Sequence, residues 1–479
     1  MLEEELIKLV DDVVAKRCEW QTVEVKKASC GTPTKLYDTL SSFSNQTGGG
    51  VIIFGVNENN NYEICGVYNS QDLQQKIAEQ SQQMQPNIRP LCTVARIKDK
   101  TVVSAEIAEC DIYDKPCFYK GAGRLRGSYI RVGEADIPMT EYEIYSFEAF
   151  KRKIEDERRI IERSTLEDLS KDNVAQYLIN LRKQKPNLSS QPDETILELQ
   201  GLVAKSKPTL AGVMLLGTYP QAFFPQLSIT AMRVPGKEIG EVGEDDERFI
   251  DNKRIEGTIP QMLDEALNFV RRNIQNKTII DDNGKRADKT EYPLKAVREI
   301  ILNALIHRDY SIHTDNSPIR LVIYEHRLEL ENPGGLYGRI TLDTLGKVSA
   351  DTRNPFIAGA LEIMINTENR FSGIPTIRKE LKNANLEPPE FTNIHGIFKV
   401  IFRKQKKAKL NLEMSLEEKI LSFCKAPRSR EEIASEFGFN PPSYMITKYI
   451  NPLIEKEFLS MTLPSKPKSK YQKYYAVKK

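Results

Sequence analysis

The chain has 479 residues, 40% of them hydrophobic and 28% charged, which is typical of a globular protein with roughly three or four domains. Its 69 Lys and Arg residues balance 67 Asp and Glu residues, so the net charge neither favours nor excludes a polyanionic partner. No apolar run approaches the ~18 residues that span a bilayer, and the first residues are acidic where a signal peptide is basic. Seven cysteines without a Cys-x-x-Cys pair, and four histidines none of which pairs with a cysteine at zinc spacing, predict a cytoplasmic protein with reduced thiols and no structural zinc.

An acidic cluster is predicted in residues 1–140, which mix short strands and helices. Glu19 and Glu24 lie five residues apart, and Lys26 shares a face with Glu24 if this stretch is a strand. A metal that activates water at a phosphate needs two or three hard oxygen ligands, and a nearby Lys neutralises the developing charge. Glu19 and Glu24 are therefore candidate metal ligands, with Lys26 and Glu58 as further catalytic candidates. The alternative is that Glu24 and Lys26 form a surface ion pair on an edge strand.

Three short motifs accompany this cluster: Glu24-Val25-Lys26, Ser44-Asn45-Gln46-Thr47-Gly48-Gly49 after a predicted helix, and Gly55-Val56 at the end of a predicted buried strand. Together they resemble the Schlafen/AlbA-type domain. In nuclease members of that family, two carboxylates that match Glu19 and Glu24 join a third acidic residue to hold Mg²⁺ or Mn²⁺ for RNA cleavage. The third position is Asn57 here, with Glu58 beside it. Other members are described only as nucleic-acid binders.

A basic stretch follows at Arg124–Gly133. It contains Arg124, Arg126 and Arg131, with Tyr129 among them, and it has no acidic residue. Guanidinium groups suit phosphates and a tyrosine ring suits stacking on a base, so we predict that these arginines bind nucleic acid. The alternative is an ordinary solvated strand.

Two segments of less distinctive sequence come next. Residues 141–170 are highly charged and predict a linker helix between domains. Residues 171–277 predict a mixed middle domain that contains an apolar run, Leu210–Gly217, expected to be a buried strand.

Three polar residues at four-residue spacing, Glu299, Asn303 and His307, lie within the apolar run Arg298–Tyr310. On a helix they share one face. An Asn oxygen suits Mg²⁺ on bridging phosphates, and a carboxylate one turn earlier can orient or deprotonate a water molecule. The alternative is an amphipathic helix whose polar face is only solvated. The face expected in the core carries Val297, Ile301 and Leu305.

Two glycine-bearing loops follow this helix. A strand pair, Ile319–Tyr324 and Arg327–Glu331, leads into Asn332-Pro333-Gly334-Gly335, where adjacent glycines let the backbone approach a ligand closely. The second loop, Glu368–Pro375, precedes a predicted helix, Thr376–Asn383, whose first turn can meet phosphates.

In this order the helix and loops resemble the nucleotide site of the gyrase, histidine kinase and MutL (GHKL) ATPase superfamily, and more specifically the divergent ATPase domain found behind Schlafen/AlbA-type domains. The resemblance covers residues 278–403 and implies an α/β sandwich that binds ATP and Mg²⁺. It implies that Glu299 is catalytic and that Asn303 holds the metal. An Asp usually recognises adenine in the superfamily, and Asn332 stands there in this chain; its carbonyl can still accept from the adenine amine. The cofactor-binding residues that it implies are Asn303, His307, Asn332, Gly334, Gly335 and Gly373. Its motifs are Tyr292-Pro293, residues 299–310, Asn332-Pro333-Gly334-Gly335-Leu336, Arg353-Asn354-Pro355 and Ser372-Gly373-Ile374.

The last segment, residues 412–479, predicts a winged helix-turn-helix with three helices followed by a wing from Phe458 to Val477. From Pro464 onward it has six lysines, three tyrosines and no acidic residue, which favours salt-sensitive phosphate binding. The alternatives are a solvated tail or a protein-docking domain. The lysines that we predict to bind nucleic acid are Lys466, Lys468, Lys470 and Lys473.

The sequence therefore predicts an α/β multidomain protein that joins an α+β Schlafen/AlbA-like domain, a GHKL-like α/β sandwich and a winged helix. The preferred hypothesis is an ATP-gated, metal-dependent nuclease, with RNA favoured over DNA, in antiviral defence or a stress response. The rival is a non-catalytic, ATP-responsive DNA-binding transcriptional regulator. A histidine kinase fits poorly, because no long helical segment presents a phosphoacceptor histidine. The expected partners are nucleic acid and further copies of the chain in a homo-oligomer, with no membrane.

Overall fold

The computed structural model describes residues 1–243, 245–280, 286–348, 351–365, 373–404, 416–439, 445–467, 469 and 471–477, without the side chains of residues 277–280, 286–289 and 418. Contacts divide the chain into two units, Met1–Lys404 and Gln405–Lys479. The first unit contains both candidate sites.

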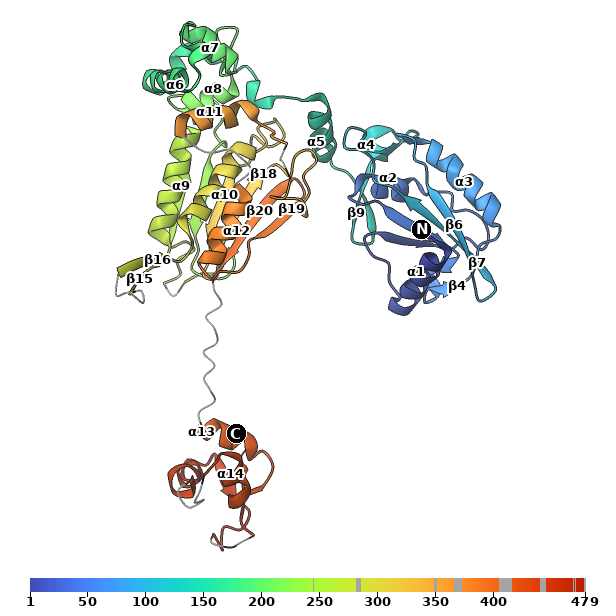
Figure 1. The fold of residues 1–479 in the computed structure, drawn as a ribbon, viewed down its shortest axis with the longest axis vertical. Coiled ribbons are helices and arrows are strands. Elements are labelled where there is room, and N and C mark those ends of the chain that lie inside the picture. Colours follow the sequence, from blue (N-terminus) through green and yellow to red (C-terminus); the bar gives the residue numbers. More distant parts are fainter. Residues whose placement is uncertain are drawn as a thin grey trace. The chain divides into compact units, whose positions relative to one another are not determined.

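The amino-terminal domain is built on a four-stranded sheet ordered β1-β2-β7-β6, with helices on its two faces (Figure 1). Side chains alternate along a strand, so Ile53 packs with Leu6 of α1 on one face while Ile52 packs with Leu40 of α2 on the other. β1 and β2 are parallel, and the other neighbours are antiparallel. The main elements are α1 (Glu3–Lys16), β1 (Val23–Lys26), α2 (Tyr37–Asn45), β2 (Gly50–Phe54), α3 (Ser70–Gln82), β6 (Leu91–Ile97) and β7 (Lys100–Ile107). Shorter ones are β3 (Val56–Asn57), β4 (Glu63–Ile64), β5 (Met84–Gln85), β8 (Phe118–Tyr119), α4 (Gly123–Gly127), β9 (Tyr129–Val132) and β10 (Ala135–Pro138).

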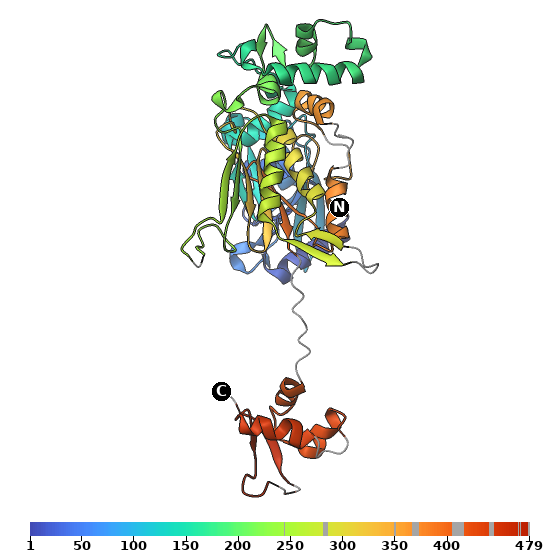
Figure 2. The ribbon, with the colours of Figure 1, turned by 90° about the vertical axis from the view of Figure 1, so that its left-hand side faces the viewer.

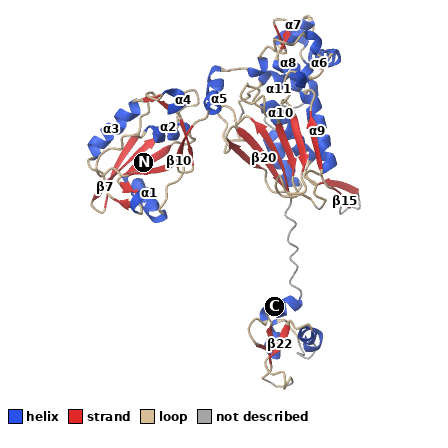
Figure 3. Ribbon diagram, turned by 180° about the vertical axis from the view of Figure 1, so that it is seen from behind, coloured by secondary structure: helices blue, strands red, loops and turns tan. Residues whose placement is uncertain are grey.

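The other half of this unit is a six-stranded sheet ordered β14-β13-β17-β18-β20-β19, and Figure 3 shows α9 and α10 behind it. One hydrophobic core joins the sheet to these helices. The mixed α/β multidomain class predicted from the sequence is thus confirmed. The elements are β13 (Ile229–Arg233), β14 (Asp251–Ile255), α9 (Ile259–Asn273), α10 (Leu294–His307), β17 (Ile319–Ile323), β18 (Arg327–Pro333), α11 (Pro355–Ile365), α12 (Gly373–Asn383), β19 (Glu390–Ile394) and β20 (Ile397–Arg403). An antiparallel pair, β15 (Asn276–Ile280) and β16 (Arg286–Thr290), lies between α9 and α10 in the chain.

Two expectations for the middle segment are wrong. The boundary predicted between residues 277 and 278 divides a single sheet, because β13 pairs in parallel with β17, for example Ile229 with Ile319. The apolar run expected to be a strand is the helix α8 (Leu210–Leu216), which Thr209 begins by accepting a hydrogen bond from the Gly212 amide at 3.1 Å. The neighbouring elements are α6 (Lys171–Gln184), α7 (Asp193–Leu199), β11 (Val203–Ala204) and β12 (Lys207–Pro208).

The predicted linker helix is shorter than residues 141–170. Helix α5 (Glu141–Arg152) begins with a reciprocal cap between Thr140 and Glu143 and ends at Lys153, whose φ of 52° leaves the helical region. A short turn after it carries Glu157. The two carboxylate oxygens of Glu157 accept hydrogen bonds from the backbone amides of Phe356 and Ile357, at 2.9 and 2.8 Å, in the first turn of α11.

Stability is expected to depend on pH through Glu157. Burial raises its pKa to about 7, although the two amide hydrogen bonds oppose the shift. Because the folded pKa lies above the unfolded one, this stabilising contribution is complete below about pH 4.5 and is lost as pH rises through about 7, on the order of 3 kcal/mol. Glu157→Gln should therefore flatten the fall in melting temperature between pH 5 and pH 8, whereas Glu155→Gln, at an exposed neighbour, should not. Parallel curves for wild type and Glu157→Gln would contradict this.

The carboxy-terminal unit has its own small core around Ile433, Ile450 and Leu459. Its helices are α13 (Leu416–Phe423), α14 (Arg430–Glu436), a π-helical turn (Ile446–Ile450) and α16 (Asn451–Glu455), and its antiparallel sheet has the order β21-β23-β22. Figure 2 draws the helices and strands of this unit in red. The strands are β21 (Arg428–Ser429), β22 (Leu459–Met461) and β23 (Lys473–Ala476). Helices followed by a hairpin agree with the predicted element order, and the winged-helix assignment stays a prediction.

Candidate nucleotide-binding site

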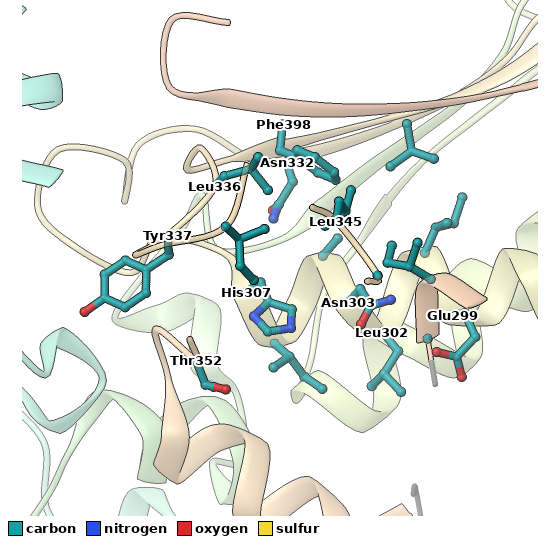
Figure 4. Close-up of a pocket in the computed structure, with 18 of the residues that line it drawn as sticks. Glu299, Leu302, Asn303, His307, Asn332, Leu336, Tyr337, Leu345, Thr352 and Phe398 are labelled. Carbon is teal, nitrogen blue, oxygen red and sulfur yellow. The ribbon is translucent and has the colours of Figure 1, made fainter. Parts of the chain in front are cut away.

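The polar face of α10 opens onto a cavity of about 640 Å³ (Figure 4). The helix begins directly after Pro293, and its apolar face is buried in the core, including Val297, Ile301 and Leu305. Glu299, Asn303 and His307 line the cavity, as their spacing predicted. The volume falls in the range of about 300–1,000 Å³ that is usual for small-molecule sites.

One wall of the cavity brings Glu299 and Asn303 against the start of α12. A Cβ atom on Gly373, the first residue of α12, would lie 2.9 Å from Asn303 Nδ2 and 3.1 Å from Glu299 Oε2. A side chain at this position would therefore require the ends of the Asn303 and Glu299 side chains to move. Backbone amides in the first turn of a helix lack intrahelical acceptors and favour anions, which suits phosphate groups. The preceding part of the predicted second loop, residues 368–372, lies outside the described residues.

Another wall presents Asn332 at the end of β18 (Figure 4). The residue is 3% exposed, and its Oδ1 atom has no hydrogen-bond partner in the part of the chain that the structure describes. The surrounding lining is apolar and includes Leu330, Phe398 and Val400. A buried acceptor without a donor is unfavourable, so a ligand that donates a hydrogen bond here would remove that penalty.

Burial sets the protonation of two side chains in the cavity. The pKa of His307 is lowered to about 4 by burial and by the nearby Arg353 cation, so the ring is neutral at physiological pH. The pKa of Glu299 is raised by burial, against the effect of Arg298. A carboxylate with a raised pKa is a better acceptor of a proton from water.

Charged side chains pack against the first glycine loop at Gly334 and Gly335. Gly334 has a φ of 108°, and a Cβ there would lie 2.8 Å from the Asp309 amide and 2.9 Å from Arg353 Nη1, so a side chain is excluded. Arg353 Nη1 lies 2.7 Å from Asp309 Oδ2, and Arg353 Nη2 donates to the Gly335 carbonyl at 3.2 Å. The sequence motif Arg353-Asn354-Pro355 marked this region, but neither Arg353 nor Asp309 was assigned a role.

The predicted acidic cluster of the amino-terminal domain is organised by a buried arginine. Arg131 Nη2 lies 2.7 Å from Glu24 Oε2, and Arg131 Nη1 lies 3.0 Å from Asp136 Oδ1. Lys26 pairs with the other oxygen of Glu24. The Arg131 side chain is 0% exposed. The prediction that Arg131 binds nucleic acid is therefore wrong, because its buried guanidinium pairs with Glu24, a carboxylate that was proposed to bind metal.

The remaining candidate ligands do not complete a metal site. Glu19 Oε1 accepts from the Val25 amide at 2.8 Å, and burial raises the pKa of Glu19 to about 8. Glu58 is exposed. Among the described residues no three or more His, Cys, Asp and Glu side chains are grouped to hold a metal ion. The set formed by Glu19, Glu24 and Glu58 is thus not assembled as predicted, because Arg131 and Lys26 occupy both oxygens of Glu24.

The other predicted nucleic-acid contacts differ in their surroundings. Arg124 lies on the short helix α4, not on a strand, and its Nη1 pairs with Glu148 at 2.6 Å. Arg126 is exposed on the same helix, and Lys466 and Lys473 are exposed in the carboxy-terminal unit. Lys468 and Lys470 lie outside the described residues.

Family models match four parts of the chain. Residues 19–140 match the model described as "Schlafen, AlbA_2", and residues 316–402 match the HATPase-type model described as "Putative ATP-dependent DNA helicase recG C-terminal". The chain thus contains a Schlafen/AlbA-type domain and a HATPase-like domain. It also matches a domain of unknown function at residues 147–230 and the "Filamentation induced by cAMP protein Fic-like, C-terminal domain" at residues 418–475. The resemblances seen for its amino-terminal and nucleotide domains are confirmed.

Two solved structures are similar to this chain. The DIP2311 protein from Corynebacterium diphtheriae is 17% identical, with a TM-score of 0.41, over 95% of this chain and 93% of that one. The amino-terminal domain of an "ATP-dependent DNA Helicase RecG-related Protein from Nitrosomonas europaea" is 24% identical, with a TM-score of 0.23, over 28% and 93%. At these TM-scores neither likeness bears on fold or function. No curated protein sequence matches significantly. Within the described residues, no helix is both long and apolar enough to cross a bilayer.

Proposed function

We propose that this protein binds ATP with Mg²⁺ in the cavity beside α10. The observation that carries the proposal is the buried Asn332 Oδ1, which has no donor among the described residues, while a second wall of the same cavity holds Glu299 and Asn303. The exocyclic amine of adenine can donate to Asn332, and the triphosphate can extend to the first turn of α12. One ligand class thus satisfies both walls. The HATPase-type match over residues 316–402 supports this ligand.

Each polar side chain of α10 has a role in this proposal. Mg²⁺ supplies positive charge to the phosphates, and Asn303 is the side chain that would hold it. Glu299 orients a water molecule or accepts its proton, as its raised pKa allows. His307 is neutral and offers a hydrogen bond without charge. The sequence predicted the same three side chains for this site, and their position along one cavity supports the prediction.

Asn332→Leu should weaken ATP affinity about tenfold, which corresponds to the loss of one hydrogen bond in a buried site. Asn332→Asp keeps an acceptor and should bind closer to wild type. Isothermal titration calorimetry with ATP and Mg²⁺ measures both, and melting temperatures report whether each variant is folded. Wild-type affinity in Asn332→Leu would place the base elsewhere, and the absence of ATP binding to wild type would refute the proposed function.

We further propose that ATP binding controls nucleic-acid binding, not metal-dependent cleavage at Glu24. The Schlafen/AlbA match supports a nucleic-acid partner, RNA or DNA. Both oxygens of Glu24 are already paired with cations, so the contacts favour the non-catalytic rival over the nuclease that the sequence suggested. A role in antiviral defence, a homo-oligomeric state and a cytoplasmic location stay predictions from the sequence.

A cleavage assay separates the two hypotheses. Transfer RNA, single-stranded RNA and duplex DNA would be incubated with Mg²⁺ or Mn²⁺, with and without ATP, and resolved on gels beside binding measurements. We expect ATP-dependent binding without cleavage. Cleavage by wild type that Glu24→Gln abolishes would restore the nuclease hypothesis and overturn ours.

A further inference from the structure

Helix α5, which follows the Schlafen/AlbA domain directly in sequence, is in contact with that domain along one side. Its Phe150 ring lies 5.2 Å, centroid to centroid, from the ring of Tyr113. Its Glu148 carboxylate pairs with Arg124 at 2.6 Å. A change in the position of α5 therefore disturbs contacts of the Schlafen/AlbA domain.

The same helix reaches the HATPase-like domain through Tyr142. The Tyr142 hydroxyl donates to Asp309 Oδ2 at 2.7 Å, across 167 residues of sequence. Its ring covers Gly396, where an added Cβ atom would collide with it. The Gly396 carbonyl in turn accepts a hydrogen bond from the Gly334 amide at 2.8 Å. Tyr142 thus contacts Gly396, whose carbonyl binds the Gly334 amide, and Asp309, which packs beside Gly334.

A second route leads from Tyr142 to the glycine loop through Arg353. Arg353 pairs with Asp309, lies 3.4 Å from the Tyr142 hydroxyl, and donates to the Gly335 carbonyl. Its guanidinium also stacks over the ring of Tyr337, 5.0 Å from the centroid, and Tyr337 lines the nucleotide cavity. Phe150 contacts the same tyrosine edge-on, with centroids 5.4 Å apart. Tyr142 near the start of α5 therefore contacts the arginine that binds the loop from Gly334 to Tyr337, and Phe150 near its end contacts the loop directly.

The protonation states of Tyr142 and Asp309 favour the hydrogen bond between them. Burial raises the pKa of Tyr142 to about 12, so the phenol keeps its proton and remains a donor. Burial alone would raise the pKa of Asp309, but Arg353 and the hydrogen bonds that it receives lower it, so the carboxylate remains charged. A neutral donor completes a buried ion pair, which is one of the stronger hydrogen-bond arrangements in proteins.

We propose that Tyr142 is a positioning residue of the nucleotide site: through Asp309, Arg353 and Gly396 it holds the glycine loop in the conformation that receives ATP. The inference rests on the proposed ATP site. Since α5 also contacts Tyr113 and Arg124, ATP binding restrains the helix that leads out of the Schlafen/AlbA domain. Suppose that a ligand of that domain moves α5. By thermodynamic linkage, this ligand changes the affinity for ATP by the same factor as ATP changes the affinity for the ligand.

Two measurements on the full chain test this inference. Calorimetry with ATP and Mg²⁺ should show that Tyr142→Phe weakens affinity roughly tenfold, the effect of removing a hydrogen bond to a charged group. Tyr145→Phe is the matched control, since it makes the same change one turn along α5, where the hydroxyl donates to Asp156 and not to Asp309. Hydrogen exchange of wild type should show that saturating ATP with Mg²⁺ slows amide exchange in residues 142–152.

The outcomes distinguish this inference from the proposed function. If wild type binds ATP while Tyr142→Phe binds equally well and exchange in α5 is unchanged, the inference fails and the ATP site stands. If Tyr142→Phe and Tyr145→Phe weaken affinity equally, the effect is a general one of α5 packing and the positioning role fails. If wild type binds no ATP, both fail.

Discussion

Arg131→Leu should destabilise the Schlafen/AlbA domain by about 3–5 kcal/mol, because it removes the buried cation that Glu24 shares with Asp136 and leaves Lys26 as the remaining partner of Glu24. Arg131 lies 2.7 Å from Glu24 and 3.0 Å from Asp136 and has no exposed side-chain surface. For a domain of this size, such a loss lowers the melting temperature by roughly 10 °C or more. Differential scanning calorimetry measures it as an earlier transition for this domain.

Arg126→Leu is the control for this prediction. Arg126 is exposed on α4, so its replacement removes the same charge without uncovering buried carboxylates, and it should leave the melting temperature nearly unchanged. A melting curve for Arg131→Leu that coincides with that of Arg126→Leu would show that the contacts of Arg131 do not stabilise the domain. The hypothesis of a metal site at Glu24 would then regain weight.

Gly373→Val should reduce ATP affinity by roughly a hundredfold or more, the largest effect expected in the nucleotide site. A Cβ atom at this position already falls 2.9 Å from Asn303 Nδ2 and 3.1 Å from Glu299 Oε2, and the added methyl groups need further space beside them. The substitution therefore displaces the proposed metal ligand and obstructs the first turn of α12, where phosphates are expected. Calorimetry with ATP, with and without Mg²⁺, measures the loss.

Gly359→Ala on α11 is the control for Gly373→Val. Gly359 lines the same cavity, but a Cβ atom there would meet no atom of the described residues within 4 Å, so binding should stay near wild type. If Gly373→Val bound ATP as tightly as Gly359→Ala, phosphates could not lie against the start of α12. The proposed orientation of ATP would then be wrong.

Periodicity in the sequence predicted the local elements of the nucleotide site well. The four-residue spacing of Glu299, Asn303 and His307 against an apolar face defines a helix with one polar side, and α10 presents these side chains to one cavity. The strand pair before Asn332 was equally clear. Such patterns depend on neighbours within a few residues, which the sequence displays directly.

The same reasoning was wrong where local patterns are ambiguous. Leu210–Gly217 is apolar throughout, so its period distinguishes neither helix nor strand, and the cap at Thr209 was the overlooked signal for a helix. The boundary drawn at residue 278 was also wrong. Strand β13 joins the sheet by pairing with β17, for example Ile229 with Ile319, and a pairing between residues so far apart in sequence leaves no local pattern.

By itself, the sequence determined the two domain families and the polar face of α10, because motifs and helical periodicity are properties of short stretches. The tertiary structure alone decided which side chains meet. Arg131 and Glu24 are 107 residues apart in sequence, and Tyr142 and Asp309 are 167 apart. A buried charge is stable only beside its partner, so these pairings determine that Glu24 lies among cations and that the carboxylate beside the glycine loop is hydrogen-bonded to a helix next to the Schlafen/AlbA domain.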